Sequence, residues 1–423
     1  MLDIKLIRDN PGFIKTEIAK TGFDGAEIDR LLEADARRRK LQRELDELRA
    51  RRARESKELG KATPQERDAK RASMRELGDQ ITSGERELTE LEKRFEELML
   101  QLPNLPRPYV PVGKDESENR LTRSEGEQRT FAFKPLPHWE LGERLGIIDF
   151  ERGVKISGTR FHFLVGLGAR LERALIAWML DVKREQGYLE VAPPLMVNTA
   201  AAIGTSHLPK FADTMYRDIE EDFWFVPTGE LPLTNFHAGE ILEAERLPIY
   251  LTAYTPCFRR EKMSAGRDVR GIKRGHQFDK VEMVKIVRPE TSDDELIKLV
   301  DDACEICRRL GIAFRVLQMC SGDLGFQAAA KYDVEMWAPG CAEWLEVSSC
   351  SNCWDFQARR NNTRFRPAKG AKTEFVHTLN GSGLGLPRTL IAVLENYQQA
   401  DGSVVVPPVL RPYLGGVDVI RSA

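Results

Sequence analysis

Residues 27–100 form two long, highly charged segments whose apolar positions repeat in the alternating three- and four-residue steps of a coiled coil. The clearer series has one glycine gap and comprises Met74, Leu77, Ile81, Gly84, Leu88, Leu91, Phe95 and Leu98. The first segment keeps the same rhythm with polar interruptions, at Ala34, Arg38, Leu41, Leu45, Leu48, Arg52, Glu55 and Leu59. The pattern predicts two long helices that pack together along one narrow seam.

The connection between these segments indicates how the two helices are paired. Gly60 is a helix-stop signal, Thr63 is a candidate N-cap, Pro64 suits the first helical position, and Glu66 would complete a capping box. A short connection between two such helices predicts an antiparallel hairpin. Helices of about 35 residues would reach roughly 50 Å at a rise of 1.5 Å per residue. The alternative reading of the pattern alone is a dimerising coiled coil or a scaffold segment.

The proline-rich stretch 102–108 cannot continue a helix and predicts a linker, after which the sequence has a mixed α/β character. Residues 168–186 predict an amphipathic helix, and a strand is expected within 188–197. Residues 246–287 predict two strands around a long loop, which implies an antiparallel sheet. The predicted class is therefore α+β: a helical hairpin in an N-terminal domain (1–106), then a domain (107–423) built on an antiparallel sheet flanked by helices.

Composition excludes several classes of protein. The net charge of −2 does not indicate a nucleic-acid binder, so local basic clusters must carry any such interpretation. No apolar run approaches the roughly 20 residues of a membrane span. The start, Met1 to Lys5, lacks the apolar stretch of a signal peptide, which favours a cytoplasmic protein. No GxGxxG follows a predicted strand and no Walker A motif is present, which argues against Rossmann and P-loop folds.

The seven cysteines, an odd number, do not indicate a disulfide framework. Two CxxC pairs suggest zinc, namely Cys304/Cys307 and Cys350/Cys353. The first pair lies on a helix predicted to start at Ser292, with Ser292 and Glu295 as a capping box, and shares the apolar stripe of that helix. The two pairs are also farther apart than compact zinc spacings. Buried thiols are therefore expected, without structural zinc.

Period-two alternation from His276 to Val287 places Phe278, Lys280 and Glu282 on one face of a strand. Phe278 and Glu282 would lie about 13 Å apart at 3.3 Å per residue, which suits a flat ring at one end of a site and a small polar group at the other. If the preceding strand persists through Glu261, Arg259 and Glu261 share a face, and Arg259 can hold a phosphate. The alternatives are that Phe278 is an ordinary core residue and that the segment with Arg259 and Glu261 is a surface ion-pair cluster.

Two further segments carry candidate ligands. Arg388 opens an apolar helical run after the glycine-rich stretch 380–383, where glycines permit close backbone approach. Glu346 and the serines that follow offer the hard oxygen ligands that magnesium takes. Strict alternation would pair Glu346 with Ser348, so the use of Ser349 would need an irregularity in the strand.

Taken together, these segments resemble the bacterial-type seryl-tRNA synthetases, which are class II aminoacyl-tRNA synthetases. The resemblance covers nearly the whole chain and includes the N-terminal hairpin. The matching stretches are 158–161, 208–211, 227–235, 257–261, 265–268, 270–271, 276–278, 346–353, 355–360 and 380–383. The chain departs from the usual pattern at Lys262-Met263, at Gly229 and at Pro387.

The resemblance implies roles residue by residue. The catalytic residues would be Arg259, Glu261 and Arg388. ATP would contact Arg259, Arg260, Glu261, Phe278, Glu346, Val347, Ser348, Ser349 and Arg388. Serine would contact Thr228, Gly229, Glu230, Glu282, Asn380 and Ser382. Mg²⁺ accompanying ATP would be held by Glu346 and Ser349.

The resemblance also implies the reaction and the partners. Serine would be activated with ATP to seryl-adenylate and transferred to the 3′ end of tRNA(Ser), with charging of tRNA(Sec) left open. The arm, and the motif 2 loop with Arg267, Arg270, Lys273 and Arg274, would bind the tRNA. Motif 1, the helix from about residue 168 with the strand that follows, would build a homodimer. Two alternatives are a paralogue that loads a carrier protein, which would lack the arm, and a non-catalytic binding protein with a decayed site.

Overall fold

The computed structural model describes residues 1–59, 63–262 and 270–422. The chain divides into two compact units. The first, called here the N-terminal unit, comprises Leu2–Ala19 and Phe23–Pro103. The second, called here the sheet unit, comprises Met1, Lys20–Gly22 and Asn104–Ala423.

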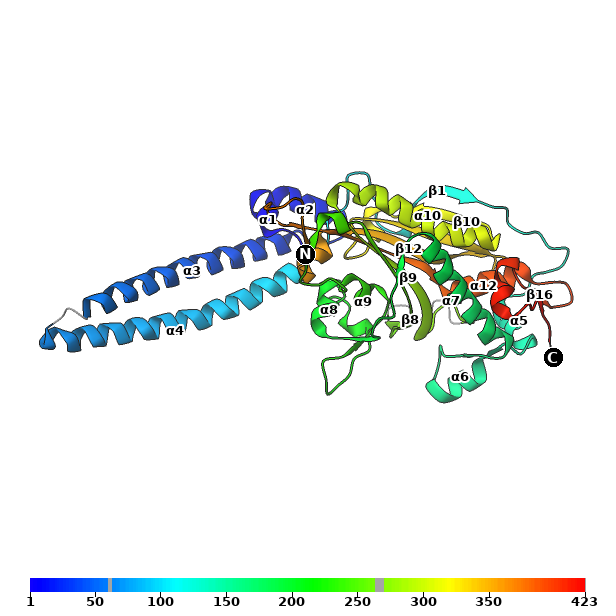
Figure 1. Ribbon diagram of the computed structural model, residues 1–423, viewed down its shortest axis with the longest axis horizontal. Coiled ribbons are helices and arrows are strands. Elements are labelled where there is room, and N and C mark those ends of the chain that lie inside the picture. Colours follow the sequence, from blue (N-terminus) through cyan, green and yellow to red (C-terminus); the bar gives the residue numbers. More distant parts are fainter. Residues whose placement is uncertain (60–62, 263–269, 423) are drawn as a thin grey trace. The chain divides into compact units, whose positions relative to one another are not determined.

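The N-terminal unit is helical and ends in a hairpin of two long helices (Figure 1). Its elements are α1 (Ile4–Asp9), α2 (Pro11–Ala19), α3 (Ala26–Leu59) and α4 (Pro64–Gln101). Arg37 of α3 forms an ion pair with Glu87 of α4 at 2.7 Å, and Arg49 pairs with Glu85 at 2.8 Å. The later residue of α3 pairs with the earlier residue of α4, as antiparallel helices require. The predicted hairpin is confirmed, whereas its stop signal Gly60 lies outside the described residues.

The seam of the hairpin follows the predicted heptad positions. Leu77, Ile81 and Leu88 of α4 are buried, and Leu45 of α3 is 1% exposed. The glycine gap in the series is explained by packing, since a Cβ on Gly84 would lie 2.7 Å from Leu45 Cδ2. At this level of the hairpin, the Leu45 side chain of α3 therefore fills the space that a side chain at position 84 of α4 would occupy.

The sheet unit is built on an eight-stranded sheet whose neighbours are all antiparallel, except for the parallel edge pair β4–β8. The antiparallel prediction is confirmed. In spatial order the strands are β1 (Arg120–Glu125), β10 (Phe314–Gln318), β11 (Ala330–Ala338), β12 (Glu343–Trp354), β15 (His377–Gly385), β9 (Gln277–Val287), β8 (Ile249–Phe258) and β4 (Leu189–Glu190).

Three helices pack on this sheet and close its main hydrophobic core: α7 (Leu167–Glu185), α10 (Ser292–Leu310) and α12 (Leu386–Tyr397) (Figure 1). The shorter helices are α5 (His138–Arg144), α6 (Phe150–Ser157), α8 (Thr199–Gly204), α9 (Glu230–Thr234) and α11 (Phe356–Asn361). The remaining strands are β2 (Ile148–Asp149), β3 (Phe163–Leu164), β5 (Met196–Val197), β6 (Trp224–Phe225), β7 (Ile241–Glu243), β13 (Arg364–Arg366), β14 (Glu374–Phe375), β16 (Val404–Val405) and β17 (Val419–Ile420).

Two local predictions need correction. The strand expected within 188–197 is two short strands, β4 and β5, separated by the segment with Pro193-Pro194, because proline has no N–H to give to a ladder. The capping box at the start of α10 is wrong. Ser292 is already helical and its hydroxyl donates to the carbonyl of Pro289 at 3.2 Å, while the Glu295 carboxylate accepts from Lys285 at 3.1 Å.

No helix within residues 1–59, 63–262 and 270–422 combines the length and the apolar character that crossing a membrane requires.

Candidate active site

A cleft of about 620 Å³ opens on the sheet unit and gathers side chains from β9, β12, β15, the segments beside β8 and the start of α12. Thirteen of the fifteen residues predicted for the site line it: Thr228, Glu230, Arg259, Glu261, Phe278, Glu282, Glu346, Val347, Ser348, Ser349, Asn380, Ser382 and Arg388. Among the residues that depart from the family pattern, Lys262 and Pro387 also line the cleft, and Met263 lies outside the described residues.

Two predicted residues do not line the cleft. Arg260 is exposed and its guanidinium lies over the ring of Tyr216, 5.3 Å from the centroid. Its expected contact with ATP stays a prediction. Gly229 lies behind the lining, where a Cβ would come within 2.9 Å of Glu282 Cβ. Because Gly229 has no Cβ, the Glu282 side chain can pack closely against this position.

Alternation along β9 separates core from cleft as the sequence predicts. Val281 and Met283 are buried in the main core, while Phe278, Lys280 and Glu282 line the cleft. The Phe278 ring and the Glu282 carboxylate thus lie on the same face of one strand. A single strand can position two chemically different groups in this way because its backbone is held by ladders to β8 and β15.

The preceding strand does not persist as expected. β8 ends at Phe258, and only the Arg259 N–H continues the pairing, by donating to the carbonyl of His276 at 2.8 Å. Glu261 has φ 48°, in the left-handed region, which is incompatible with a strand. Arg259 and Glu261 still both reach the cleft, although by a turn of the chain and not by alternation.

One end of the cleft, called here the open end, carries an aromatic ring and two arginines. The Arg259 guanidinium lies 4.9 Å from the centroid of the Phe278 ring, and its Nε donates to the carbonyl of Pro227 at 3.1 Å. Arg388 donates to the carbonyl of Glu346 at 2.8 Å, and its guanidinium lies 3.4 Å from the Glu346 carboxylate. A flat apolar surface flanked by cations suits a purine ring and its phosphates.

The strand irregularity that Ser349 requires is present in β12. Val334 pairs with Ser348, whereas the next residue of β11, Glu335, pairs with Glu346, so Val347 is an extra residue. The bulge shifts the alternation by one residue and brings Glu346 and Ser349 to the same cleft.

A buried carboxylate that the sequence did not single out lies beside this bulge. Asp333 pairs with Ser349 across the ladder and is 8% exposed. Burial, followed by the nearby Glu346 carboxylate, raises the pKa of Asp333 to about 7. Its Oδ1 has no hydrogen-bond partner within the described part of the chain. Two carboxylates and a serine hydroxyl are a hard-oxygen donor set of the kind that Mg²⁺ takes, so these residues fit a divalent cation.

The other end of the cleft, called here the closed end, is a buried network of charged and hydroxyl groups. Thr228 Oγ1 donates to Glu282 Oε2 at 3.0 Å and accepts from Lys280 Nζ at 2.7 Å. Lys280 also forms an ion pair with Glu282. Glu282 is 2% exposed and Lys280 is 7% exposed. A buried carboxylate is tolerated here because a buried ammonium and a hydroxyl compensate its charge.

Glu230 forms the second acidic group of the closed end. Its Oε1 accepts from Gln357 Nε2 at 2.6 Å and from Asn380 Nδ2 at 3.1 Å. Burial, followed by the neighbouring Glu282 carboxylate, raises the pKa of Glu230 to about 7. A cationic ligand beside Glu230 would relieve both effects, which is the environment that a ligand ammonium needs.

Sequence reasoning left Lys280, Gln357 and Asp333 without a role. Lys280 could have been found, because alternation places it on the face of Phe278 and Glu282. Gln357 lies on α11 and Asp333 on β11, and their proximity to Glu230 and Ser349 depends on pairing between distant segments.

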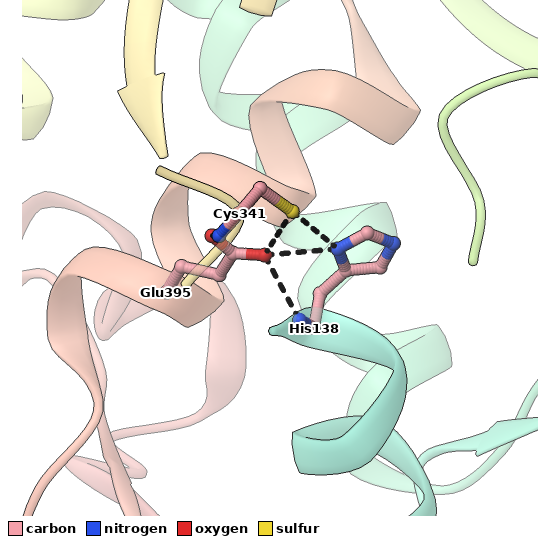
Figure 2. A group of neighbouring side chains, drawn as sticks. All are labelled: His138, Cys341 and Glu395. Carbon is pink, nitrogen blue, oxygen red and sulfur yellow. Dashed lines mark hydrogen bonds and ion pairs between the residues drawn. The ribbon is translucent and has the colours of Figure 1, made fainter. Parts of the chain in front are cut away.

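The cysteines of the two CxxC pairs are buried in the sheet unit. Cys304 Sγ accepts from Arg123 at 3.0 Å, and Cys350 Sγ lies 3.8 Å from the carbonyl of Leu299. The group of possible metal ligands found in the described residues lies elsewhere and consists of His138, Cys341 and Glu395 (Figure 2).

Comparison with known proteins gives matches over the whole chain. Residues 1–106 match the seryl-tRNA synthetase N-terminal domain, and residues 212–397 match the class II tRNA synthetase core domain (G, H, P, S and T). The chain is 61% identical to the serine–tRNA ligase of Roseiflexus sp. (strain RS-1), with 100% of both chains covered. It is 56% identical to that of Chloroflexus aurantiacus (strain J-10-fl), with 99% of this chain and 100% of the relative covered.

Two solved structures are similar over the same length. The crystal structure of seryl-tRNA synthetase from Pyrococcus horikoshii complexed with ATP has a TM-score of 0.93 at 39% identity, with 100% of both chains covered. The cytoplasmic enzyme from Naegleria fowleri in complex with AMP has a TM-score of 0.87 at 30% identity, covering 100% of this chain and 99% of that one.

Proposed function

The chain belongs to the seryl-tRNA synthetase family, and on that premise we propose that its cleft activates L-serine with ATP and that the serine is then joined to the 3′ end of tRNA(Ser). The observation that carries the proposal is the pairing, on one strand, of an aromatic surface beside Arg259 with a buried acidic notch at Glu282. A nucleotide and a small amino acid that carries a hydroxyl are the ligands that fit these two ends.

At the open end, the adenine stacks on Phe278, and Arg259 holds the α-phosphate of ATP. Arg388 contacts the γ-phosphate after it exchanges its contacts with Glu346 for the more highly charged ligand. Glu346 and Ser349 would hold the Mg²⁺ that accompanies ATP, and Asp333, which pairs with Ser349 across the ladder, would add a further carboxylate. When bound, Mg²⁺ supplies positive charge that offsets the charge developing on the phosphates.

At the closed end, Glu230 binds the ammonium of serine, and Glu282 accepts a hydrogen bond from the serine hydroxyl. Alanine lacks this hydroxyl and would leave the buried Glu282 and Lys280 without the ligand partner for which they are arranged. Threonine keeps the hydroxyl but adds a methyl group. Packing excludes it, because the space beside Glu282 is so narrow that even a Cβ on Gly229 would lie 2.9 Å from Glu282 Cβ.

The chemical step is an in-line displacement at the α-phosphorus. The serine carboxylate attacks, the bond to the bridging oxygen of pyrophosphate breaks, and pyrophosphate leaves with the electron pair. Arg259 neutralises charge at the α-phosphate, and the cleft fixes the carboxylate for attack, so positioning and electrostatics carry the catalysis. A hydroxyl of the terminal adenosine of the tRNA then attacks the seryl carbonyl and releases AMP.

The arm formed by α3 and α4 binds the tRNA. Its arginines make exposed ion pairs, such as Arg37–Glu87 and Arg51–Glu55, which contribute little to stability and can be exchanged for contacts with phosphates. Binding of this kind reads the shape of the RNA and not its bases. Arg270, Lys273 and Arg274 of the motif 2 loop meet the acceptor end, whereas Arg267 lies outside the described residues.

A homodimer and a cytoplasmic setting complete the proposal. Exposed large apolar side chains that a second copy would cover lie in the motif 1 strand region, at Leu189 and Met196, and in the segment before the motif 1 helix, at Val154, Ile156, Phe163 and Val165. The cytoplasm is where aminoacylated tRNA is consumed in translation. Charging of tRNA(Sec) would follow where the host supplies a tRNA with a similar long arm.

ATP–pyrophosphate exchange with each amino acid in turn tests the activation step. We expect exchange with serine, with alanine and glycine at least about a thousandfold lower, as expected for a site that pairs a ligand hydroxyl. Exchange driven by alanine or glycine and not by serine would refute the substrate.

Deletion of residues 30–97 separates the roles of the two units. Exchange should be largely retained, since the cleft lies within the sheet unit, while transfer to tRNA(Ser) should be crippled. Transfer to tRNA(Ser) at the wild-type rate by the deleted chain would contradict the role of the arm.

A further inference from the structure

Three side chains from separate elements meet in the sheet unit (Figure 2). His138 begins α5, Cys341 lies in the turn between β11 and β12, and Glu395 lies on α12. His138 and Glu395 have 0% exposure. His138 Nδ1 lies 2.9 Å from Glu395 Oε1, and Cys341 Sγ donates to the same oxygen at 3.1 Å. None of these residues has a role in the proposed reaction.

The hydrogen bonds around Glu395 determine which nitrogen of His138 carries the proton. Glu395 Oε2 accepts from the backbone N–H groups of Gly340 and Cys341, at 2.8 and 2.9 Å. Glu395 Oε1 accepts from the backbone N–H of His138 at 2.9 Å. A carboxylate is acceptor-only, so Nδ1 of the ring must be the donor towards it. Burial, which outweighs the nearby Glu395, lowers the pKa of His138, so the ring is neutral and its Nε2 is a free acceptor.

That acceptor is used by the loop that follows β8. The backbone N–H of Ile272 donates to His138 Nε2 at 3.1 Å. The approach is close, because a Cβ on Gly271 would lie 2.0 Å from Nε2, and Gly271 has φ 74°. The next two residues, Lys273 and Arg274, line the cleft. A chain of hydrogen bonds thus leads from helix α12 through one imidazole to the segment with Lys273, which forms an ion pair with Glu343, and Arg274, which lies 3.9 Å from the Glu261 carboxylate.

Metal binding by the same three residues conflicts with this arrangement. Coordination through Nδ1 would displace its proton and leave the neutral ring protonated at Nε2. An N–H at Nε2 would then face the N–H of Ile272, and two donors would oppose each other at 3.1 Å. The geometry therefore favours a hydrogen-bond relay over a metal site.

We propose that His138 is a positioning residue for nucleotide binding: oriented by Glu395, it holds the N–H of Ile272 and so fixes Lys273 and Arg274 at the open end of the cleft. The inference rests on the proposed function and adds a role in ATP binding to Lys273 and Arg274, which in that function also meet the acceptor end of the tRNA. It does not involve the closed end, whose residues are held by β9, β15 and α11. Loss of the relay should therefore weaken ATP binding and leave serine binding nearly unchanged.

The test compares His138→Phe, which removes both ring nitrogens, with His138→Gln, whose amide can donate to Glu395 and accept from Ile272. Cys341→Ala is the matched control, because it removes the thiol that also donates to Glu395 Oε1 but leaves both ring nitrogens of His138, and so the acceptor of the Ile272 N–H, in place. Gly271→Ala is a further variant that disturbs the contact from the loop side, because its Cβ would clash with His138 Nε2, while it keeps both polar side chains of the His138–Glu395 pair, so a folding defect in His138→Phe does not end the test.

The first readout is hydrogen exchange at the Ile272 amide, and the second is the KM for ATP against the KM for serine in pyrophosphate exchange. In His138→Phe and Gly271→Ala we expect Ile272 to exchange about tenfold faster and the KM for ATP to rise about three- to tenfold, with the KM for serine within about twofold. His138→Gln and Cys341→Ala should stay near wild type in both readouts.

Unaltered exchange at Ile272 in a folded His138→Phe or Gly271→Ala protein would overturn the relay. Faster exchange with equal changes in both KM values would overturn its link to the nucleotide. Failure of the proposed function is distinguishable, since it would appear as the absence of serine-dependent exchange in the wild type while the Ile272 amide still responds to the variants.

Discussion

The two ends of the cleft share one strand but are built differently. At the closed end, Glu230 and Glu282 are 4% and 2% exposed and make hydrogen bonds within a buried network. At the open end, Phe278 is half-buried and the Glu346 side chain is 46% exposed. The closed end can select one small ligand, because a wrong ligand leaves its buried polar groups without hydrogen-bond partners. The open end instead offers charged side chains and an aromatic surface.

The difference also concerns what must move. Arg388 and Glu346 are paired with each other at the open end, so ATP has to displace existing contacts. At the closed end, the Lys280–Thr228–Glu282 network is already assembled and the ligand completes it. The site for the amino acid is therefore preorganised, whereas the site for the nucleotide must rearrange when ATP binds.

The largest effect is expected at the open end from Arg259→Ala. We expect exchange to fall below detection, at least about a thousandfold, because Arg259 is the cation that the described part of the chain places over Phe278 to neutralise the α-phosphate. The measurement is pyrophosphate exchange at saturating serine and ATP. Arg260→Ala, at the neighbouring arginine outside the cleft lining, should lose far less activity. Near-normal exchange in Arg259→Ala would remove its role.

Glu282→Ala should produce the next largest effect and confine it to the amino acid. We expect kcat/KM for serine to fall about a hundredfold or more, because the serine hydroxyl loses its acceptor and Lys280 is left buried without its partner. The KM for ATP should change less than about threefold. Steady-state exchange kinetics with each substrate varied would reveal a coupled loss, which would contradict two separately built ends.

Glu230 predicts a pH dependence of serine binding. Its pKa is raised to about 7, so at lower pH the carboxyl is protonated and cannot bind the ammonium. We expect kcat/KM for serine to rise about tenfold between about pH 6 and about pH 8 and then to level off. Glu230→Gln should be much less active and should lack this rise. A profile for serine that is flat across pH 7 would contradict the assignment.

Raising the salt concentration should produce the smallest effect, and it should act mainly on the KM for ATP and little on the KM for serine. Exposed charges are screened strongly and buried charges weakly, so raising the salt from about 0.05 M to about 0.5 M should raise the KM for ATP a few-fold and change the KM for serine less than about twofold. Equal sensitivity of the two KM values to salt would indicate that the closed end is more accessible to solvent than its burial suggests.

The features that the sequence predicted are those controlled by local period. The heptad positions of α3 and α4 predicted the hairpin, because the seam depends on residues three and four apart. Alternation on β9 likewise placed Phe278 and Glu282 on one face, since a strand held on both sides keeps its period of two.

The features that the sequence pattern missed or predicted wrongly depend on interruptions of the strand alternation or on segments that are distant in the sequence. The bulge at Val347 brings Ser349 into the cleft, and the pattern of β12 alone gave no reason to place it there. Glu261 leaves the strand through a left-handed conformation, which side-chain type did not indicate. Asp333 and Gln357 come to the site from other elements, and the roles of the cleft residues themselves came from family resemblance.

The most direct test of the two-ended cleft is a crystal structure with a non-hydrolysable seryl-adenylate analogue. The adenine should lie against Phe278, the phosphate substitute at Arg259, the ammonium at Glu230 and the hydroxyl within hydrogen-bond distance of Glu282. An analogue bound with its hydroxyl turned away from Glu282, or with its adenine away from Phe278, would contradict the assignment of the two ends.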